Sequence, residues 1–188
     1  MNIFYLDPNP RVCAEMHNDK HCIKMILEYA QLLSTAHRVL DGTITVGVSS
    51  SGRKRTTYVL NSANDSILYS ATHINHPSSI WVRKTHQNYM WLAELLEELC
   101  MEYTYRYGKI HKVERDGLMQ LLKNEFPRNL PIGAFTGPTP AMPDEVKVPG
   151  NSLLSYHNYY ISNKQHLASW KGKVNSRNIP EWFSNASL

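Results

Sequence analysis

The chain has 188 residues, of which 42% are hydrophobic, and its formal net charge is +4 at pH 7. This length suits a single domain, and the hydrophobic content is too high for a disordered protein. The charge permits a polyanionic partner without requiring one. Because the sequence has no run of 18 apolar residues and no basic, apolar leader, we expect a cytoplasmic protein without membrane association.

The first long helix is expected to run from about residue 11 to residue 40, after a turn formed by the sequence DPNP. A helical projection gathers apolar residues on one side, which predicts a core face. That face comprises Met16, Cys22, Ile23, Ile26, Leu27, Ala30, Leu33, Ala36 and Leu40. The opposite side carries His17, His21, Lys24, Glu28, Gln31, Thr35 and Arg38.

Residues 43–57 are β-branched, then rich in glycine and serine, then basic. They predict a mobile loop or small hairpin that exposes Arg53, Lys54 and Arg55. A short helix is expected around residues 60–72. The following segments predict a second long helix from Ser78 to Tyr107, ended by Gly108, and another amphipathic helix over residues 112–123.

Six of the ten prolines lie in residues 127–150, so this segment is expected to be an extended loop wrapped over the surface. A helix is expected from residue 152 to about residue 170, and Trp182 and Phe183 should pack back on the body. We therefore predict an all-α fold with one poorly defined β-prone loop. Its single domain, 1–188, comprises a helical core (10–125), the Pro-rich loop (127–150) and a C-terminal helix and tail (152–188).

The polar side of the first helix is the leading candidate site. His17, His21, Lys24 and Glu28 recur at spacings of four, three and four, which places them on one helical face. An ordinary solvated face is one interpretation. On the other, Glu28 acts as a general base or stabilises a developing cation, while its cationic neighbours hold a phosphate.

The turn THINHPSSIWVRK (72–84) is a second candidate. It is either a helix entry capped by Asn75 or an anion-binding helix N-terminus, with His73, His76 and Arg83 nearby. Tyrosines interleaved with basic residues at 103–109 and 155–164 suit either core packing or stacking on nucleic-acid bases.

Metal and cofactor signatures are weak or missing. His17 and His21 have the spacing to share one ion, but no carboxylate cluster accompanies them. The three cysteines are odd in number and lack a C-x-x-C pair, which argues against a disulfide framework and a structural zinc site. Because P-loop, dinucleotide-binding, α/β-hydrolase and deaminase motifs are also lacking, we expect neither a metal nor a cofactor.

The motifs DKHCIKMILEYAQLLSTAHR and HINHPSSIWVR resemble uncharacterised proteins of tailed phages. More distantly, they resemble the phage pyrimidine-dimer DNA glycosylase of endonuclease V type and its bacterial relatives. The resemblance covers roughly residues 1–110. It rests on Asp19-x-His21 followed by Glu28, and on the NHP turn with Trp81 shortly behind it.

The resemblance implies a compact all-α fold and a specific chemistry. In that family a glutamate on the first helix assists glycosyl cleavage, and the N-terminal amine forms a Schiff base with the sugar. Glu28 matches this glutamate, and His21 matches the histidine that precedes it. The family's mature chain begins with threonine, whereas Asn2 follows Met1 here, so the Met1 amine or Lys24 would have to supply the nucleophile.

The leading hypothesis is a phage-encoded, DNA-directed enzyme that acts on a pyrimidine nucleotide by glycosylase and lyase chemistry in the host cytoplasm. Its predicted catalytic residues are Glu28, His21 and Lys24. Its predicted phosphate-binding residues are His17, Arg38, His73, Asn75, His76 and Arg83. The alternatives are a transferase or hydrolase of modified pyrimidine bases or nucleotides, and a non-catalytic phage protein that sequesters a nucleotide.

Overall fold

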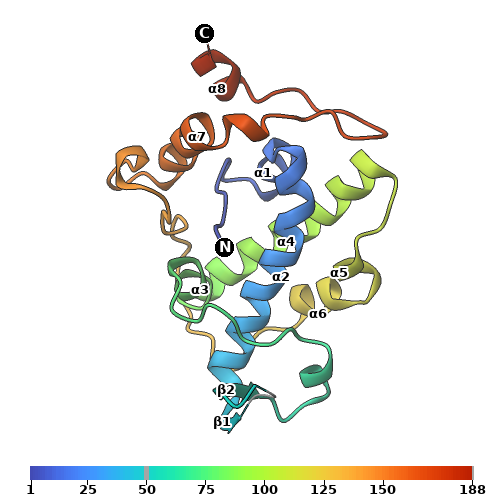
Figure 1. Cartoon of the computed structure of the whole chain (residues 1–188), viewed down its shortest axis with the longest axis vertical. Helices are drawn as coiled ribbons and strands as arrows, with labels where there is room; N and C mark the ends of the chain where they lie inside the picture. Colours follow the sequence, from blue (N-terminus) through green and yellow to red (C-terminus); the bar gives the residue numbers. More distant parts are fainter. Residues whose placement is uncertain (49–50, 188) are drawn as a thin grey trace.

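The computed structural model describes residues 1–48 and 51–187 and is mainly helical (Figure 1). The helices are α1 (Pro10–Met16), α2 (Asp19–Asp41), α3 (Pro77–Val82), α4 (His86–Tyr107), α5 (Lys112–Arg115), α6 (Leu118–Asn124), α7 (Ser152–Asn163) and α8 (Glu181–Ser184). Strands β1 (Thr43–Val48) and β2 (Lys54–Val59) pair antiparallel. The prediction of an all-α fold is therefore correct only in its main part, because the β-prone loop forms a small sheet. Residues 49 and 50 of that loop lie outside the described residues.

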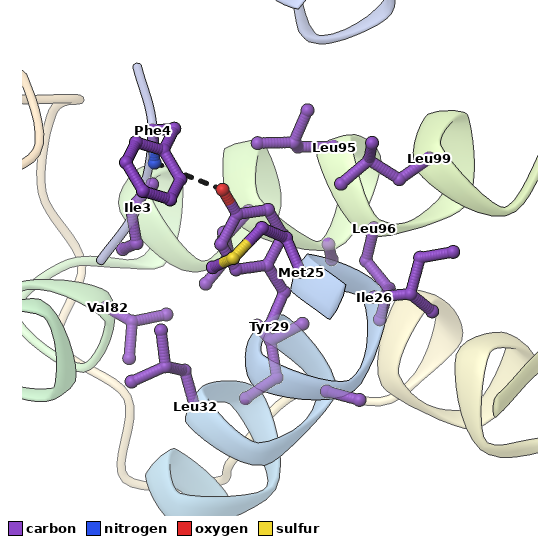
Figure 2. Close-up of a cluster of buried hydrophobic side chains, with 14 of the residues drawn as sticks. Ile3, Phe4, Met25, Ile26, Tyr29, Leu32, Val82, Leu95, Leu96 and Leu99 are labelled. Atoms are coloured by element: carbon purple, nitrogen blue, oxygen red, sulfur yellow. Dashed lines mark hydrogen bonds between the residues drawn. The ribbon is translucent and has the colours of Figure 1, made fainter. Parts of the chain in front are cut away.

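Helices α2 and α4 pack against each other at the centre of the molecule (Figure 1). Their apolar side chains join those of the N-terminal segment in one core cluster (Figure 2). Within it, Tyr29 of α2 is fully buried, and its hydroxyl accepts a 3.0 Å hydrogen bond from the backbone N–H of Phe4. The extended residues 2–6 are thereby attached to the middle of α2.

The first predicted helix is in fact two helices. The chain is extended at His17, and the Asn18 side chain accepts a hydrogen bond from the backbone N–H of His21 to start α2. Asparagine is a favoured N-cap because its short side chain replaces a missing backbone acceptor. The periodicity continued across this break, so the prediction of one helix over residues 11–40 is wrong.

The predicted core face of α2 is also partly wrong. Ile23 and Leu27, placed in the core, are each 42% exposed, whereas Thr35 and Arg38, placed on the polar side, are buried. The cause is that α2 lies against α3, α4 and α6, so its second half is covered on several sides. A projection with one apolar face does not describe a helix surrounded in this way.

The later helices are shorter than predicted. The expected helix over 78–107 is interrupted after α3, and Thr85 caps the start of α4. The expected helix over 112–123 is divided at Gly117, whose φ of 81° favours glycine. Around residues 60–72 the structure has only the 3₁₀ turn Ala63–Ser66, and α7 ends at Asn163.

The Pro-rich segment runs extended along α3 and α4, apart from the 3₁₀ turn Asp144–Val146. Trp81 Nε1 donates to the carbonyl of Thr136 at 3.0 Å, and the backbone N–H of Thr136 donates to Asn88 at 2.9 Å. At the C-terminal end, Phe183 is buried and Trp182 stacks on His157 with ring centroids 3.9 Å apart. Within the described residues, no helix combines the length and the apolar character needed to cross a bilayer.

Candidate functional site

The four polar residues predicted to share one helical face divide into two environments in the structure. His17, at the end of α1, and His21, in the first turn of α2, are buried among aromatic rings. Glu28 is largely buried but keeps contact with Lys24, whose side chain is 69% exposed. The candidate site is therefore the second pair, and the histidines belong to the core.

Glu28 lies between two primary amines. Its Oε2 is 3.7 Å from the α-amine of Met1, and its Oε1 is 3.0 Å from Lys24 Nζ. The Met1 side chain is 6% exposed and that of Glu28 is 13% exposed. An ion pair so well shielded from water is screened less than a surface pair.

The apolar N-terminal segment explains why the α-amine lies here. Ile3, Phe4, Tyr5 and Leu6 are all buried, so the first residues are drawn into the core. The hydrogen bond from Phe4 to Tyr29 attaches the segment to α2 one residue beyond Glu28 (Figure 2). The position of the α-amine is therefore set by core packing.

The second candidate site, the turn 72–84, lies next to the same N-terminal residue. Ser78 Oγ donates to the Met1 carbonyl at 3.4 Å, and His76 caps α3 by accepting a hydrogen bond from the backbone N–H of Ser78. Burial lowers the pKa of His76, the charges of the α-amine and of His73 lower it further, and Glu28 opposes these effects. His73 and His76 therefore lie in the electrostatic surroundings of the amine and carboxylate.

Asn75 does not have the predicted capping role, because His76 occupies the cap position. Asn75 is exposed in the turn that leads to α3. In the same turn His73 has a positive φ of 49°, and its Nδ1 is 2.7 Å from Thr72 Oγ1. The turn thus presents polar side chains beside the N-terminus.

The two core histidines are neutral at physiological pH. His17 Nδ1 is 2.7 Å from the Cys13 carbonyl and its Nε2 is 3.1 Å from the Tyr29 hydroxyl. Burial lowers the pKa of His17 to about 4. Burial, aided by the nearby positive charges of Lys164 and Lys24, lowers the pKa of His21 to about 2, and His21 Nδ1 is 2.6 Å from the Tyr160 hydroxyl. Neither offers a cationic group to a phosphate at neutral pH.

The two predicted phosphate-binding arginines are directed at the protein's own groups. Arg38 is 7% exposed and clamps the chain after β2. Its guanidinium donates to Asp65 and to the carbonyls of Tyr58, Asp65, Leu68 and Tyr69. Arg83 donates to the carbonyl and hydroxyl of Ser79 at 2.9 and 3.0 Å, and burial lowers its pKa. The structure brings neither guanidinium to Glu28.

Periodicity on α2 located Lys24 and Glu28 but gave no role to Ser78 of α3, whose hydroxyl donates to the Met1 carbonyl. The useful signal was the apolar run from Ile3 to Leu6, which has to be buried and therefore draws the α-amine inward. Among the described residues, no group of three or more histidine, cysteine or acidic side chains is arranged to hold a metal ion. The site is thus a carboxylate with two amines and two histidines nearby.

Comparison with known proteins adds no relative to this picture. The chain matches no family model, no curated protein and no solved structure. Its function has to be argued from the residues and their geometry.

Proposed function

We propose that this protein is a DNA-directed enzyme that attacks a pyrimidine nucleotide by glycosylase and lyase chemistry. The observation that carries the proposal is the shielded contact of 3.7 Å between the Met1 α-amine and Glu28. A primary amine held beside a carboxylate has the parts needed for imine formation at a sugar carbon. The resemblance to tailed-phage proteins adds the proposal that the enzyme is phage-encoded and works in the host cytoplasm.

The α-amine, which is paired with Glu28 as an ammonium ion at rest, loses a proton to water and then attacks C1′ of the deoxyribose. The bond from C1′ to the pyrimidine nitrogen breaks, and its electron pair leaves with the base, which takes up a proton. Glu28 stabilises the positive charge that develops on the sugar and accepts the proton lost by the amine. Opening of the sugar ring, in which O4′ takes up a proton, leaves an imine between C1′ and the amine nitrogen. Loss of a proton from C2′ then lets the 3′ phosphate leave with the electron pair of its bond to C3′.

The surroundings of Glu28 fit an anionic substrate. Lys24 is mostly exposed beside the carboxylate, and His73 and His76 lie on the neighbouring turn. Such groups suit the phosphates that flank a target nucleotide. Chemistry on a base in a duplex also requires that the base, or its partner, leaves the stack.

The test is reductive trapping with borohydride on duplexes that contain an abasic site or a pyrimidine dimer. We expect a covalent protein–DNA adduct, which peptide mapping assigns to the Met1 amine. Glu28→Gln removes the charge but keeps the shape, and should slow trapping about 100-fold or more, as expected for loss of a general base. Glu94→Gln, an exposed change on α4, is the matched control and should leave trapping unchanged.

An adduct that forms equally fast with Glu28→Gln would contradict the role of this carboxylate. An adduct mapped to Lys24 would keep the chemistry and change the nucleophile. If neither duplex gave an adduct or a strand break while a pyrimidine nucleotide bound tightly without turnover, the proposal would fail in favour of nucleotide sequestration.

A further inference from the structure

The hairpin β1–β2 projects from the C-terminal end of α2, away from α1 and α7 (Figure 1). Every residue of β1 is exposed. Ile44, Val46 and Val48 alternate along the strand, so they share one face, and they are 60%, 60% and 74% exposed. The partners across the ladder, Tyr58, Thr56 and Lys54, extend this face. A ribbon that leaves its apolar residues in water has a surface suited to a partner.

The hairpin is also strongly cationic. Arg53 directly precedes β2, Lys54 and Arg55 are its first two residues, and all three are exposed. No aspartate or glutamate occurs in the sequence from Gly42 to Asn64. The basic side chains therefore give this end of the molecule a positive potential that favours a polyanion.

We infer that the β1–β2 hairpin is an arm that holds duplex DNA through its grooves and phosphates. The major groove of B-form DNA is about 12 Å wide and admits a two-stranded ribbon. The apolar face formed by Ile44, Val46 and Val48 would contact sugars and base edges, and the basic residues would contact phosphates. A second copy of this chain fits poorly, because two such hairpins would bring like charges together. Double-stranded RNA fits poorly because its major groove is deep and narrow.

A cavity of about 470 Å³ beside β2 supports this assignment. Arg55 lines it together with the hydroxyl-bearing residues Thr56, Thr57, Ser66 and Ser70. The carboxylate of Asp65 also lines it, and its charge is paired with Arg38. Arginine and hydroxyl side chains are common phosphate contacts in protein–DNA complexes. The cavity at the base of the hairpin can thus hold the sugar–phosphate backbone of a DNA strand that borders the groove occupied by the hairpin.

The distance between the hairpin and the candidate site allows both to contact the same DNA duplex. From Glu28 to the end of α2 the helix rises by roughly 20 Å, at about 1.5 Å per residue. This corresponds to about six base pairs at roughly 3.4 Å each. The inference rests on the proposed function for its choice of DNA, and it adds a contact that does not take part in the chemistry.

The first experiment measures binding of a short undamaged DNA duplex by fluorescence anisotropy over a series of salt concentrations. Lys54→Ser with Arg55→Ser should weaken binding and reduce the slope of log K against log salt by about 2, because each neutralised phosphate contributes about 0.9. Lys171→Ser with Lys173→Ser, two exposed changes at the other end of the molecule, is the matched control and should keep the wild-type slope. An unchanged slope in the hairpin variant overturns the inference.

A second variant tests the apolar face. Val46→Ser with Val48→Ser should weaken DNA binding at every salt concentration while the slope stays that of the wild type. If instead this variant bound DNA normally and converted a dimer to a monomer, the face would be an interface between copies and the inference would be wrong. A hairpin variant that lost affinity for duplex RNA but not for DNA would also overturn it.

These outcomes are independent of the proposed chemistry. If hairpin variants lost DNA binding but the wild type gave no borohydride adduct, the arm would stand and the glycosylase proposal would fail. If the adduct formed and the hairpin variants bound normally, the chemistry would stand and the arm would fail.

Discussion

At the scale of single residues, burial sets the protonation of the histidines on and before α2. His17, His21 and His37 are nearly or fully buried, and burial lowers their pKa values to about 4, about 2 and about 4. An unfolded histidine has a pKa near 6.5. Between pH 6.5 and about 4 the unfolded chain therefore binds protons that the folded chain does not.

This difference gives stability a pH dependence with a definite sign. The contribution of these neutral histidines to the unfolding free energy is fully present above about pH 6.5 and is lost as the pH falls toward 4. In urea denaturation, the free energy of unfolding should fall by up to about 1.4 kcal/mol per pH unit for each histidine that stays neutral in the folded state. Between pH 6 and pH 5, His37→Gln should reduce the slope of the unfolding free energy against pH by the contribution of one histidine. An unchanged slope would show that His37 titrates normally.

At the scale of elements, α2 determines both the site and much of the core. Its contacts with α3, α4 and α6 turn some polar positions inward and leave two apolar ones outside. The 3.6-residue period correctly located the centres of α2 and α4. It did not locate where these helices start, because a cap such as Asn18 or Thr85 depends on where the preceding chain is held. The end of α4 at Gly108 was predicted correctly, because a glycine in the left-handed conformation is a local stop signal.

The orientation of α2 can be tested by two matched substitutions. Leu33 is fully buried and Leu27 is 42% exposed, although the periodicity placed both on the core face. Leu33→Ala should lower the free energy of unfolding by about 2–5 kcal/mol, because it removes buried contacts and leaves a cavity. Leu27→Ala should cost less than about 1 kcal/mol. Equal losses in urea denaturation would contradict the orientation of the helix.

At the scale of the whole molecule, a buried ionic network joins the two ends of the chain. Arg106 is fully buried and donates to Glu102 at 2.6 Å, to Asp19 at 3.1 Å and to the His17 carbonyl at 2.9 Å. Asp19 also accepts hydrogen bonds from the C-terminal segment, from Ser169 Oγ, Lys171 N and Gly172 N. The network holds this segment against the junction of α1 and α2.

Removing the shared carboxylate should release that segment. Asp19→Ala leaves part of the Arg106 charge uncompensated in the interior and should cost about 3–5 kcal/mol of unfolding free energy. Hydrogen exchange should then lose protection over residues 169–177 before the rest of the chain. Asp116→Ala, which breaks the exposed ion pair with Lys112, is the control and should cost less than about 1 kcal/mol. Equal protection in both variants would show that Asp19 does not hold the segment.

The sequence by itself determined that the protein is mainly helical, with α2 and α4 as its long helices and an extended Pro-rich segment after them. These features depend on the spacing of apolar residues and on the backbone conformations that proline and glycine favour. Both can be read from residues that are close together in the sequence. The sequence also put Lys24 and Glu28 one helical turn apart, since that spacing is a property of any helix.

Only the tertiary structure decided which of the polar residues lie together in the candidate site. The contact between Met1 and Glu28 joins residues far apart in the chain, and it exists because the core buries the apolar N-terminal segment against α2. The same packing removed His17, His21 and Arg38 from solvent. Burial depends on what the rest of the chain places around a residue, and helical spacing carries no information about it.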